Sequence, residues 1–193
     1  MAIALTLPRP VTDEDLLEFS RRNPGYQFER TAKGELVVTP TGSESGRRSA
    51  ELLGQLYSWN QRAGAGLVFD SSTGFRLPDG AVFSPDASWV QRPRWDALTP
   101  TQRQGFAPLC PDVVFEIRSE SDSLSDIQTK MGKYLANGAR LGVLVDPRSR
   151  TVEIFRPMRP IDMVETLQNP DTVPLDPELS RFVLDLKAIF SRD

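Results

Sequence analysis

The sequence predicts an α/β fold in a single domain spanning residues 1–193, with a core over about 11–156 and a C-terminal extension over 157–193. Three observations support this fold class. Strand-like runs rich in β-branched and aromatic residues dominate the middle of the chain. Two longer segments, about 45–62 and 124–137, repeat their apolar residues at helical spacing. The second of them lies between two strand-like runs, as in α/β proteins.

The N-terminal part is expected to form a helix and a β-hairpin. Thr12 and Asp15 match the pattern of a helix N-cap with a reciprocal acid, so a short helix should follow Thr12. Two strand-like segments, 26–31 and 35–39, come next, and the glycine-containing turn between them predicts a hairpin. The longer helix over about 45–62 follows and ends at a pair of glycines.

The rest of the chain should supply most of the sheet. Strands are predicted over residues 67–70, 73–77, 81–90, 112–118, 141–145 and 151–155. A short helix is expected after Thr99-Pro100. The helix over 124–137 has Ser123 and Asp126 as a predicted capping box and Gly138 at its end. No repeat or linker divides the chain.

The composition narrows the chemistry. With no histidine, His-based triads and His-liganded zinc sites are excluded, so a bound metal should be Mg²⁺ or Mn²⁺ held by oxygen ligands. The single cysteine and the absence of an apolar run of 18 residues predict a soluble, cytoplasmic protein with no membrane partner. A net charge of −3 argues against a broad basic surface for nucleic acid, but it permits a small basic patch.

Two acids on neighbouring strands are the candidate metal ligands. Strand alternation in 112–118 places Glu116 and Arg118 on one face, whereas the core residues point to the other. Asp86 lies upstream between two apolar pairs. Together, Asp86 and Glu116 could chelate one Mg²⁺, with the backbone carbonyl of Ile117 as a third protein ligand and water completing the shell. Glu44 is either an auxiliary ligand or a charge at a helix start.

The helix over 124–137 offers a candidate cation. Lys130 borders its apolar stripe and can lean toward the sheet, whereas Lys133 falls almost opposite the stripe and should meet water. Lys130 could orient or deprotonate an attacking water and stabilise charge on the phosphate. Arg118 cannot act as a base, but it can hold a phosphate oxygen. An ordinary interpretation also remains, because an Asp after Pro is usually a turn residue and a strand Glu usually faces solvent.

Several ordered motifs resemble one known family. They are Ser84-Pro85-Asp86-Ala87, the run Pro-Asp-Val-Val-Phe-Glu-Ile-Arg-Ser over 111–119, and Lys130 with the residues that follow it. The chain resembles the Uma-type restriction endonucleases of the PD-(D/E)xK nuclease superfamily over about 11–186. The resemblance implies a restriction-endonuclease-like mixed central sheet flanked by helices, with the active site at its edge. It also assigns Asp86 and Glu116 as metal ligands.

Two positions depart from the superfamily pattern. The lysine often stands two residues after the glutamate, where this chain has Arg118. The Uma-type family commonly moves that lysine to the following helix, where Lys130 matches. The family also often has a histidine near the start of the long helix. Arg48 occupies that place, and we expect it to contact a phosphate instead.

These observations lead to one main hypothesis and two alternatives. The main hypothesis is an endodeoxyribonuclease that uses Mg²⁺ or Mn²⁺ to activate water against phosphodiester bonds, with DNA as its partner. A homodimer suits the cutting of both strands of a duplex. The first alternative is a catalytically inactive nuclease-fold binding or assembly module, which the pI of about 5.2 and Arg118 favour. The second is a nuclease for RNA or free nucleotides that uses the same site.

Overall fold

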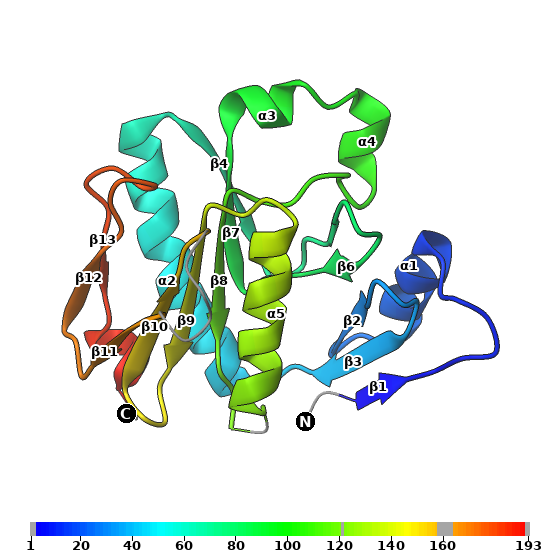
Figure 1. The fold of residues 1–193 in the computed structure, drawn as a ribbon, viewed down its shortest axis with the longest axis horizontal. Coiled ribbons are helices and arrows are strands. Elements are labelled where there is room, and N and C mark those ends of the chain that lie inside the picture. Colours follow the sequence, from blue (N-terminus) through cyan, green and yellow to red (C-terminus); the bar gives the residue numbers. More distant parts are fainter. Residues whose placement is uncertain (1–2, 121, 158–163, 192–193) are drawn as a thin grey trace.

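A six-stranded sheet forms the centre of the protein in the computed structural model, which describes residues 3–120, 122–157 and 164–191 (Figure 1). Its strands, in spatial order, are β11 (Glu165–Gln168), β10 (Thr151–Phe155), β9 (Leu141–Asp146), β8 (Val113–Ile117), β7 (Ala87–Gln91) and β4 (Gly66–Asp70). β8 and β9 pair in parallel, and the other neighbours pair antiparallel. The predicted mixed sheet is therefore confirmed.

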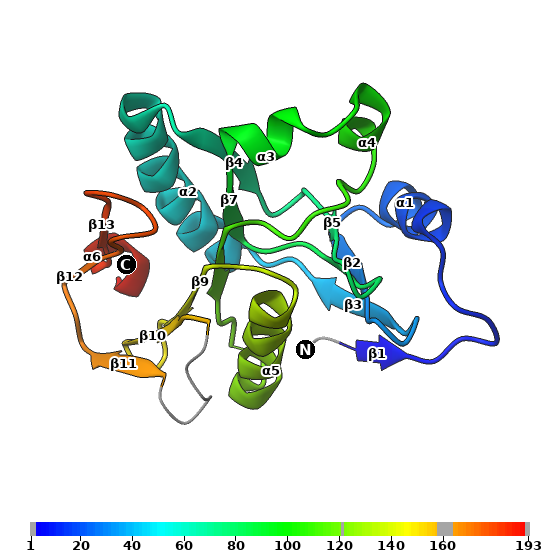
Figure 2. The same cartoon turned by 45° about the horizontal axis from the view of Figure 1, so that its top comes forward.

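Two long helices cover the two faces of this sheet, α2 (Ser43–Ala63) on one side and α5 (Leu124–Ala136) on the other (Figures 1 and 2). Alternation along β8 divides its side chains between them. Phe115 packs in the hydrophobic cluster under α2, whereas Val114 packs with Tyr134 under α5. β8 is buried on both faces, which explains why its sequence is almost wholly apolar.

A second, smaller sheet is built mainly from the N-terminal residues. Its strands, in spatial order, are β1 (Ile3–Leu5), β3 (Leu36–Pro40), β2 (Tyr26–Arg30), β6 (Val82–Phe83) and β5 (Phe75–Arg76). Helix α1 (Asp13–Arg22) packs on this sheet, and Thr12 and Asp15 form the predicted capping box. This N-terminal sheet lies beside α5, apart from the central sheet (Figure 2).

The strand predicted over residues 81–90 is wrong in one respect, because it is divided between the two sheets. Its first part is β6, and its second part is β7. The break falls at Ser84-Pro85-Asp86. Proline has no N–H for a strand ladder, and the Ser84 N–H donates to the side chain of Glu29 at 2.6 Å rather than to a strand. The chain crosses from one sheet to the other here and delivers Asp86 to the start of β7.

Two other local predictions need correction, and a third is confirmed. The strand predicted over 73–77 is limited to Phe75–Arg76. Ser123 is the N-cap of α5, but its side chain bonds to Ser125 at 2.8 Å rather than to the helix backbone, so the predicted capping box is not formed. The short helix expected after Thr99 is present as α4 (Pro100–Gln104), and an additional helix, α3 (Arg92–Asp96), precedes it.

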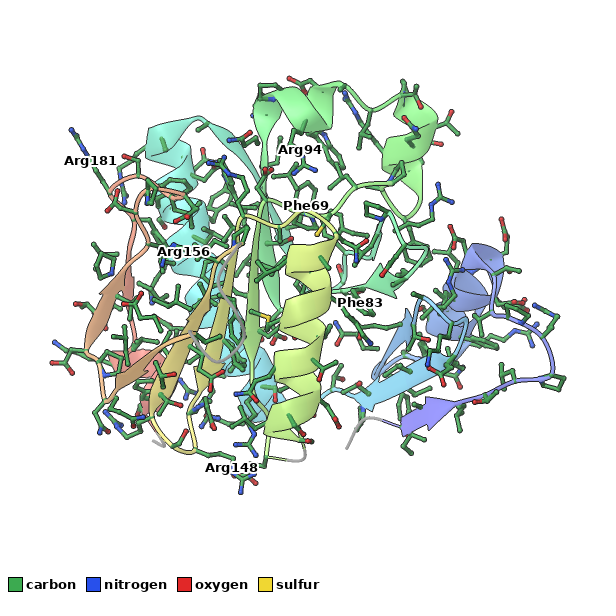
Figure 3. All side chains as sticks on the ribbon, in the orientation of Figure 1. Phe69, Phe83, Arg94, Arg148, Arg156 and Arg181 are labelled. Atoms are coloured by element: carbon green, nitrogen blue, oxygen red, sulfur yellow. The ribbon has the colours of Figure 1, made fainter. Side chains whose placement is uncertain are left out.

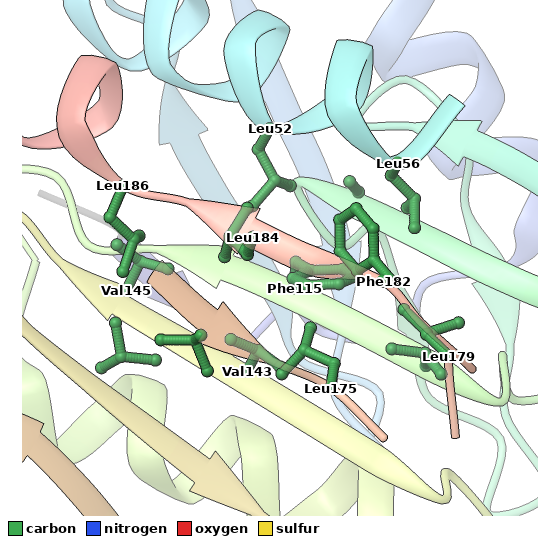
Figure 4. Close-up of a cluster of buried hydrophobic side chains, with 14 of the residues drawn as sticks. Leu52, Leu56, Phe115, Val143, Val145, Leu175, Leu179, Phe182, Leu184 and Leu186 are labelled. Atoms are coloured by element: carbon green, nitrogen blue, oxygen red, sulfur yellow. The ribbon is translucent and has the colours of Figure 1, made fainter. Parts of the chain in front are cut away.

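The described part of the C-terminal extension completes the main core. It contains β12 (Thr172–Pro174), β13 (Val183–Asp185) and α6 (Lys187–Phe190). Figure 4 shows its leucines and Phe182 packed between α2 and the strands of the central sheet. Residues 158–163 and 192–193 of this extension lie outside the described residues. Within the described ranges, no helix has the length and apolar character needed to cross a membrane.

Candidate active site

Asp86 and Glu116 face each other across two neighbouring strands of the central sheet. Ala87 pairs with Phe115 in the antiparallel ladder of β7 and β8, so the preceding Asp86 lies opposite Glu116. The carboxylate of Asp86 accepts the backbone N–H of Ile117 at 2.7 Å and the hydroxyl of Ser49 at 3.4 Å. The crossover at Ser84–Asp86 and the end of β8 thus bring these two predicted acids together.

Lys130 reaches this pair of acids from α5. Its ammonium nitrogen lies 2.8 Å from Oε1 of Glu116, and its side chain is only 20 % exposed. One helical turn later, the hydroxyl of Tyr134 donates to the same carboxylate oxygen at 3.1 Å. Lys130 therefore leans toward the sheet, as its position at the border of the apolar stripe predicts.

A third acid, Glu29, joins the site from the N-terminal sheet. It lies on β2, is 7 % exposed, and its Oε1 is 2.9 Å from the ammonium of Lys130. Sequence reasoning missed it, because a single Glu in a hairpin strand next to Arg30 looks like an ordinary surface residue. The available signal was strand alternation, which places Glu29 opposite to Phe28. That signal could not show that a second sheet covers this face.

These residues lie in a pocket of about 910 Å³ between the N-terminal sheet, the start of α2 and α5, which we call the acidic pocket. Its charged lining residues are five acids and two lysines: Glu29, Asp86, Glu116, Asp122, Asp126, Lys130 and Lys133. Phe83, labelled beside α5 in Figure 3, also lines it. Lys133, which was expected to meet water, is partly exposed, and its ammonium lies 5.9 Å from the centre of the Phe83 ring.

Burial and like charges shift the protonation of the acids. The pKa of Glu116 is raised to about 8. Burial is the main cause, Lys130 opposes the rise, and the charges of Asp86 and Glu29 add to it. Burial also raises the pKa of Asp86, against the opposing effects of the Ile117 N–H and Lys130. For neither carboxylate do the surrounding hydrogen bonds and positive charge fully offset the cost of burying its negative charge.

Lys130 responds in the opposite direction. Burial alone would lower its pKa, but Glu116 and Glu29 raise that pKa above the ordinary value of a lysine. Its ammonium therefore keeps its proton. Of the two roles that the sequence suggests for Lys130, this favours stabilising charge over deprotonating water.

The donor set fits a hard divalent cation. When ionised, Asp86, Glu116 and Glu29 carry three negative charges, and Lys130 offsets one of them, which leaves a net charge of −2. Mg²⁺ is usually bound by one or two carboxylates and keeps several waters. Over the described ranges, no three Asp, Glu or Cys side chains are grouped to hold a metal. The fit is thus to a site with two carboxylate ligands, Asp86 and Glu116.

The other predicted site residues have partners elsewhere. Arg118 donates to Asp146 at 2.7 Å. Arg48 is ion-paired with Glu44 at 3.0 Å, and its side chain is 12 % exposed. Glu44 is exposed, and its hydrogen bond with Arg47 lowers its pKa. Among the described residues that line the acidic pocket, none of the three predicted residues Arg118, Arg48 and Glu44 is found.

Comparison with known proteins places this fold and site in context. The sequence model of the Uma2 family, described as "Putative restriction endonuclease", matches residues 13–187. The crystal structure of "a putative nuclease belonging to DUF820" from Anabaena variabilis ATCC 29413 superposes with a TM-score of 0.72 at 22 % identity, over 94 % of this chain and 98 % of that chain. The comparison with curated proteins gave no significant match. Because the family match spans most of the chain, the protein belongs to the Uma2 family of restriction endonuclease-like proteins.

Proposed function

We propose that this protein is a metal-dependent nuclease that hydrolyses phosphodiester bonds in DNA. The observation that carries the proposal is the convergence of Asp86, Glu116 and Lys130 in one pocket, with the ammonium 2.8 Å from Glu116. Perturbed, partly uncompensated acids in a pocket are typical of functional sites. Membership in the Uma2 family supports a nuclease over other hydrolases.

Asp86, Glu116 and the backbone carbonyl of Ile117 are the proposed ligands of Mg²⁺ or Mn²⁺. When bound, such an ion activates a water and neutralises charge on a phosphate. The protein's own part is to hold both carboxylates in position. Asp86 is fixed by the N–H of Ile117, and Glu116 by Lys130 and Tyr134.

Lys130 is the proposed group that stabilises charge on the phosphate. An ammonium has three N–H donors, and two of them are directed at Glu116 and Glu29. We assign the third to a phosphate oxygen bound in the acidic pocket. Because this charge is fixed before the substrate arrives, it needs no reorganisation during the reaction.

The beginning of α2 offers a second place for phosphate. Gly42, Ser45 and Gly46 line the acidic pocket, and the N-cap Gly42 has no side chain that could satisfy the first amides of the helix. The N-terminus of a helix attracts anions through these amides and the helix dipole. A phosphate could therefore lie between the start of α2 and Lys130.

The direct test is cleavage of plasmid DNA by purified protein in Mn²⁺ or Mg²⁺, with EDTA as the metal-free control. We expect nicking that depends on the metal and is lost in Asp86→Asn. Single-stranded DNA and RNA should be tested in parallel to define the substrate. If no nucleic acid is cut with either metal, the nuclease proposal fails. DNA binding without affinity for Mn²⁺ would then favour the inactive binding module.

The proposal includes a homodimer acting in the cytoplasm. Two active sites related by two-fold symmetry would suit cleavage of both strands of a duplex. Sedimentation of the purified protein with and without DNA measures the oligomeric state, and a monomer under both conditions would contradict this part of the proposal.

A further inference from the structure

Glu29 contributes to the site from outside the central sheet. Its Oε1 accepts the N–H of Ser84 at 2.6 Å and also contacts the ammonium of Lys130 at 2.9 Å. Both partners are fixed, because Ser84 lies in the crossover before Asp86, and Lys130 lies within α5. Glu29 is only 7 % exposed. Burying a carboxylate is costly in free energy unless it is paired, so Glu29 needs the contact with Lys130.

The charge balance shows what Glu29 changes. With Glu29, Asp86 and Glu116 all ionised, Lys130 divides its charge between two carboxylates, and the whole cluster carries a net charge of −2. Without that charge, the ammonium would pair with Glu116 alone, and the cluster would carry −1. A lysine bound only to Glu116 would compete with a metal ion for one of its two carboxylate ligands.

We propose that Glu29 is a positioning residue that acts through Lys130. It holds the ammonium between the two sheets and leaves the negative charge of Asp86 and Glu116 available to a divalent cation. This inference rests on the metal site of the proposed function. It makes the N-terminal sheet part of that site, since metal affinity then depends on a residue of β2.

The alternative role for Glu29 is that of a direct metal ligand. One observation argues against it: in the described part of the chain, no three acidic side chains are grouped to bind a metal. A positioning role and a ligand role also predict different behaviour when Lys130 is removed.

Calorimetric titration with Mn²⁺ alone provides the first test. Glu29→Gln keeps an oxygen that can accept the Ser84 N–H but removes the charge opposite Lys130. We expect Mn²⁺ affinity to fall about 10–100-fold, the usual cost of losing a residue that supports a metal ligand. The matched control is Glu35→Gln in the same hairpin, since Glu35 contacts Thr31 rather than Lys130. The Mn²⁺ affinity of this control variant should stay within about twofold of wild type.

A double-mutant cycle then separates the two roles. In a Lys130→Met background, Glu29→Gln should change Mn²⁺ affinity by no more than about twofold, because the residue through which it acts is gone. A loss of affinity that persists in this background would identify a direct ligand and overturn the inference. Wild-type affinity in the Glu29→Gln single variant would also overturn it.

The outcomes distinguish this inference from the proposed function. Absence of Mn²⁺ binding by the wild-type protein would refute the metal site and this inference together. Mn²⁺ binding that is indifferent to Glu29 would refute this inference alone. If Glu29→Gln does not fold, the ¹⁵N resonance of the Lys130 ammonium in the wild-type protein decides. It should stay protected from exchange when Mg²⁺ is added, and loss of that protection overturns the inference.

Discussion

Two ion-pair clusters lie at the end of β8, one around Glu116 and the other around Arg118, and they differ in charge balance. The cluster in the acidic pocket sets Asp86, Glu116 and Glu29 against one lysine. The cluster at Arg118 sets one guanidinium against Asp146 at 2.7 Å, and both are largely buried. The second cluster is also completed by a backbone group, since Asp146 accepts the N–H of Arg148, which is labelled in Figure 3, at 2.9 Å.

The pKa shifts follow this balance. Burial and the acids beside it together raise the pKa of Glu116 to about 8, although Lys130 opposes the rise. Burial would also raise the pKa of Asp146, but Arg118 and the turn that follows β9 more than offset it, so the pKa of Asp146 is lowered. Burial with full compensation is typical of a structural ion pair, whereas burial without it is typical of a functional site. The two clusters should therefore respond differently to mutation.

The largest expected contrast concerns Asp86. Asp86→Asn removes a proposed metal ligand but keeps an oxygen that can accept the Ile117 N–H. Metal-dependent cleavage should fall at least about 10³-fold, because a bound ion contributes several kcal/mol to the reaction and each 1.4 kcal/mol is tenfold in rate. The melting temperature should stay the same or rise, since repulsion with Glu116 is relieved. Retained cleavage, or marked destabilisation, would place Asp86 with the structural cluster.

The second contrast concerns the two lysines of α5. Lys130→Met should lower the cleavage rate about 10²–10³-fold, as for removal of a preorganised charge at a reacting group. Lys133→Met is the matched control, because Lys133 lines the same pocket and lies over Phe83. Its effect should be much smaller and mainly on substrate binding. Equal losses in both variants would mean that general positive charge, rather than the placement of Lys130, matters.

Local patterns in the sequence predicted most of the fold. Strand alternation in 112–118 separated Glu116 from the core face of β8, and helical spacing placed Lys130 toward the sheet. These features depend on neighbours within a few residues, so periodicity determines them. The capping pattern at Thr12 is local in the same way, and it is present.

Features that depend on distant residues were not predicted. The partner of Glu29 lies about a hundred positions along the chain, and strand alternation carries no information about which sheet will cover a face. Arg118 shares its strand face with Glu116, but β8 ends at Ile117, and Asp146 at the end of β9 binds the arginine instead. The break in strand 81–90 could have been foreseen from Pro85, although not the change of sheet that accompanies it.

The structural cluster provides a stability prediction. Asp146→Asn should lower the free energy of unfolding by about 1.5–3 kcal/mol, because the hydrogen bond to the Arg118 guanidinium loses its charged acceptor. The pKa of Asp146 is lowered in the folded state, so its contribution is complete above the ordinary aspartate pKa of about 3.9 and is lost as the pH falls through the folded value. Urea unfolding at several pH values measures this. If the difference in unfolding free energy between wild type and Asp146→Asn grew as the pH fell below about 4, the prediction would be contradicted.

The smallest and most direct test measures the charge balance itself. In metal-free protein, the carboxyl ¹³C resonance of Glu116 should titrate near pH 8. Asp86→Asn should lower this pKa, because the like charge opposite Glu116 is removed, and Lys130→Met should raise it, because the compensating ammonium is lost. Arg118→Lys, in the other cluster, should leave it unchanged, since that charge remains beside Asp146. A Glu116 pKa that is insensitive to Asp86 would mean that the two carboxylates do not share one site in solution.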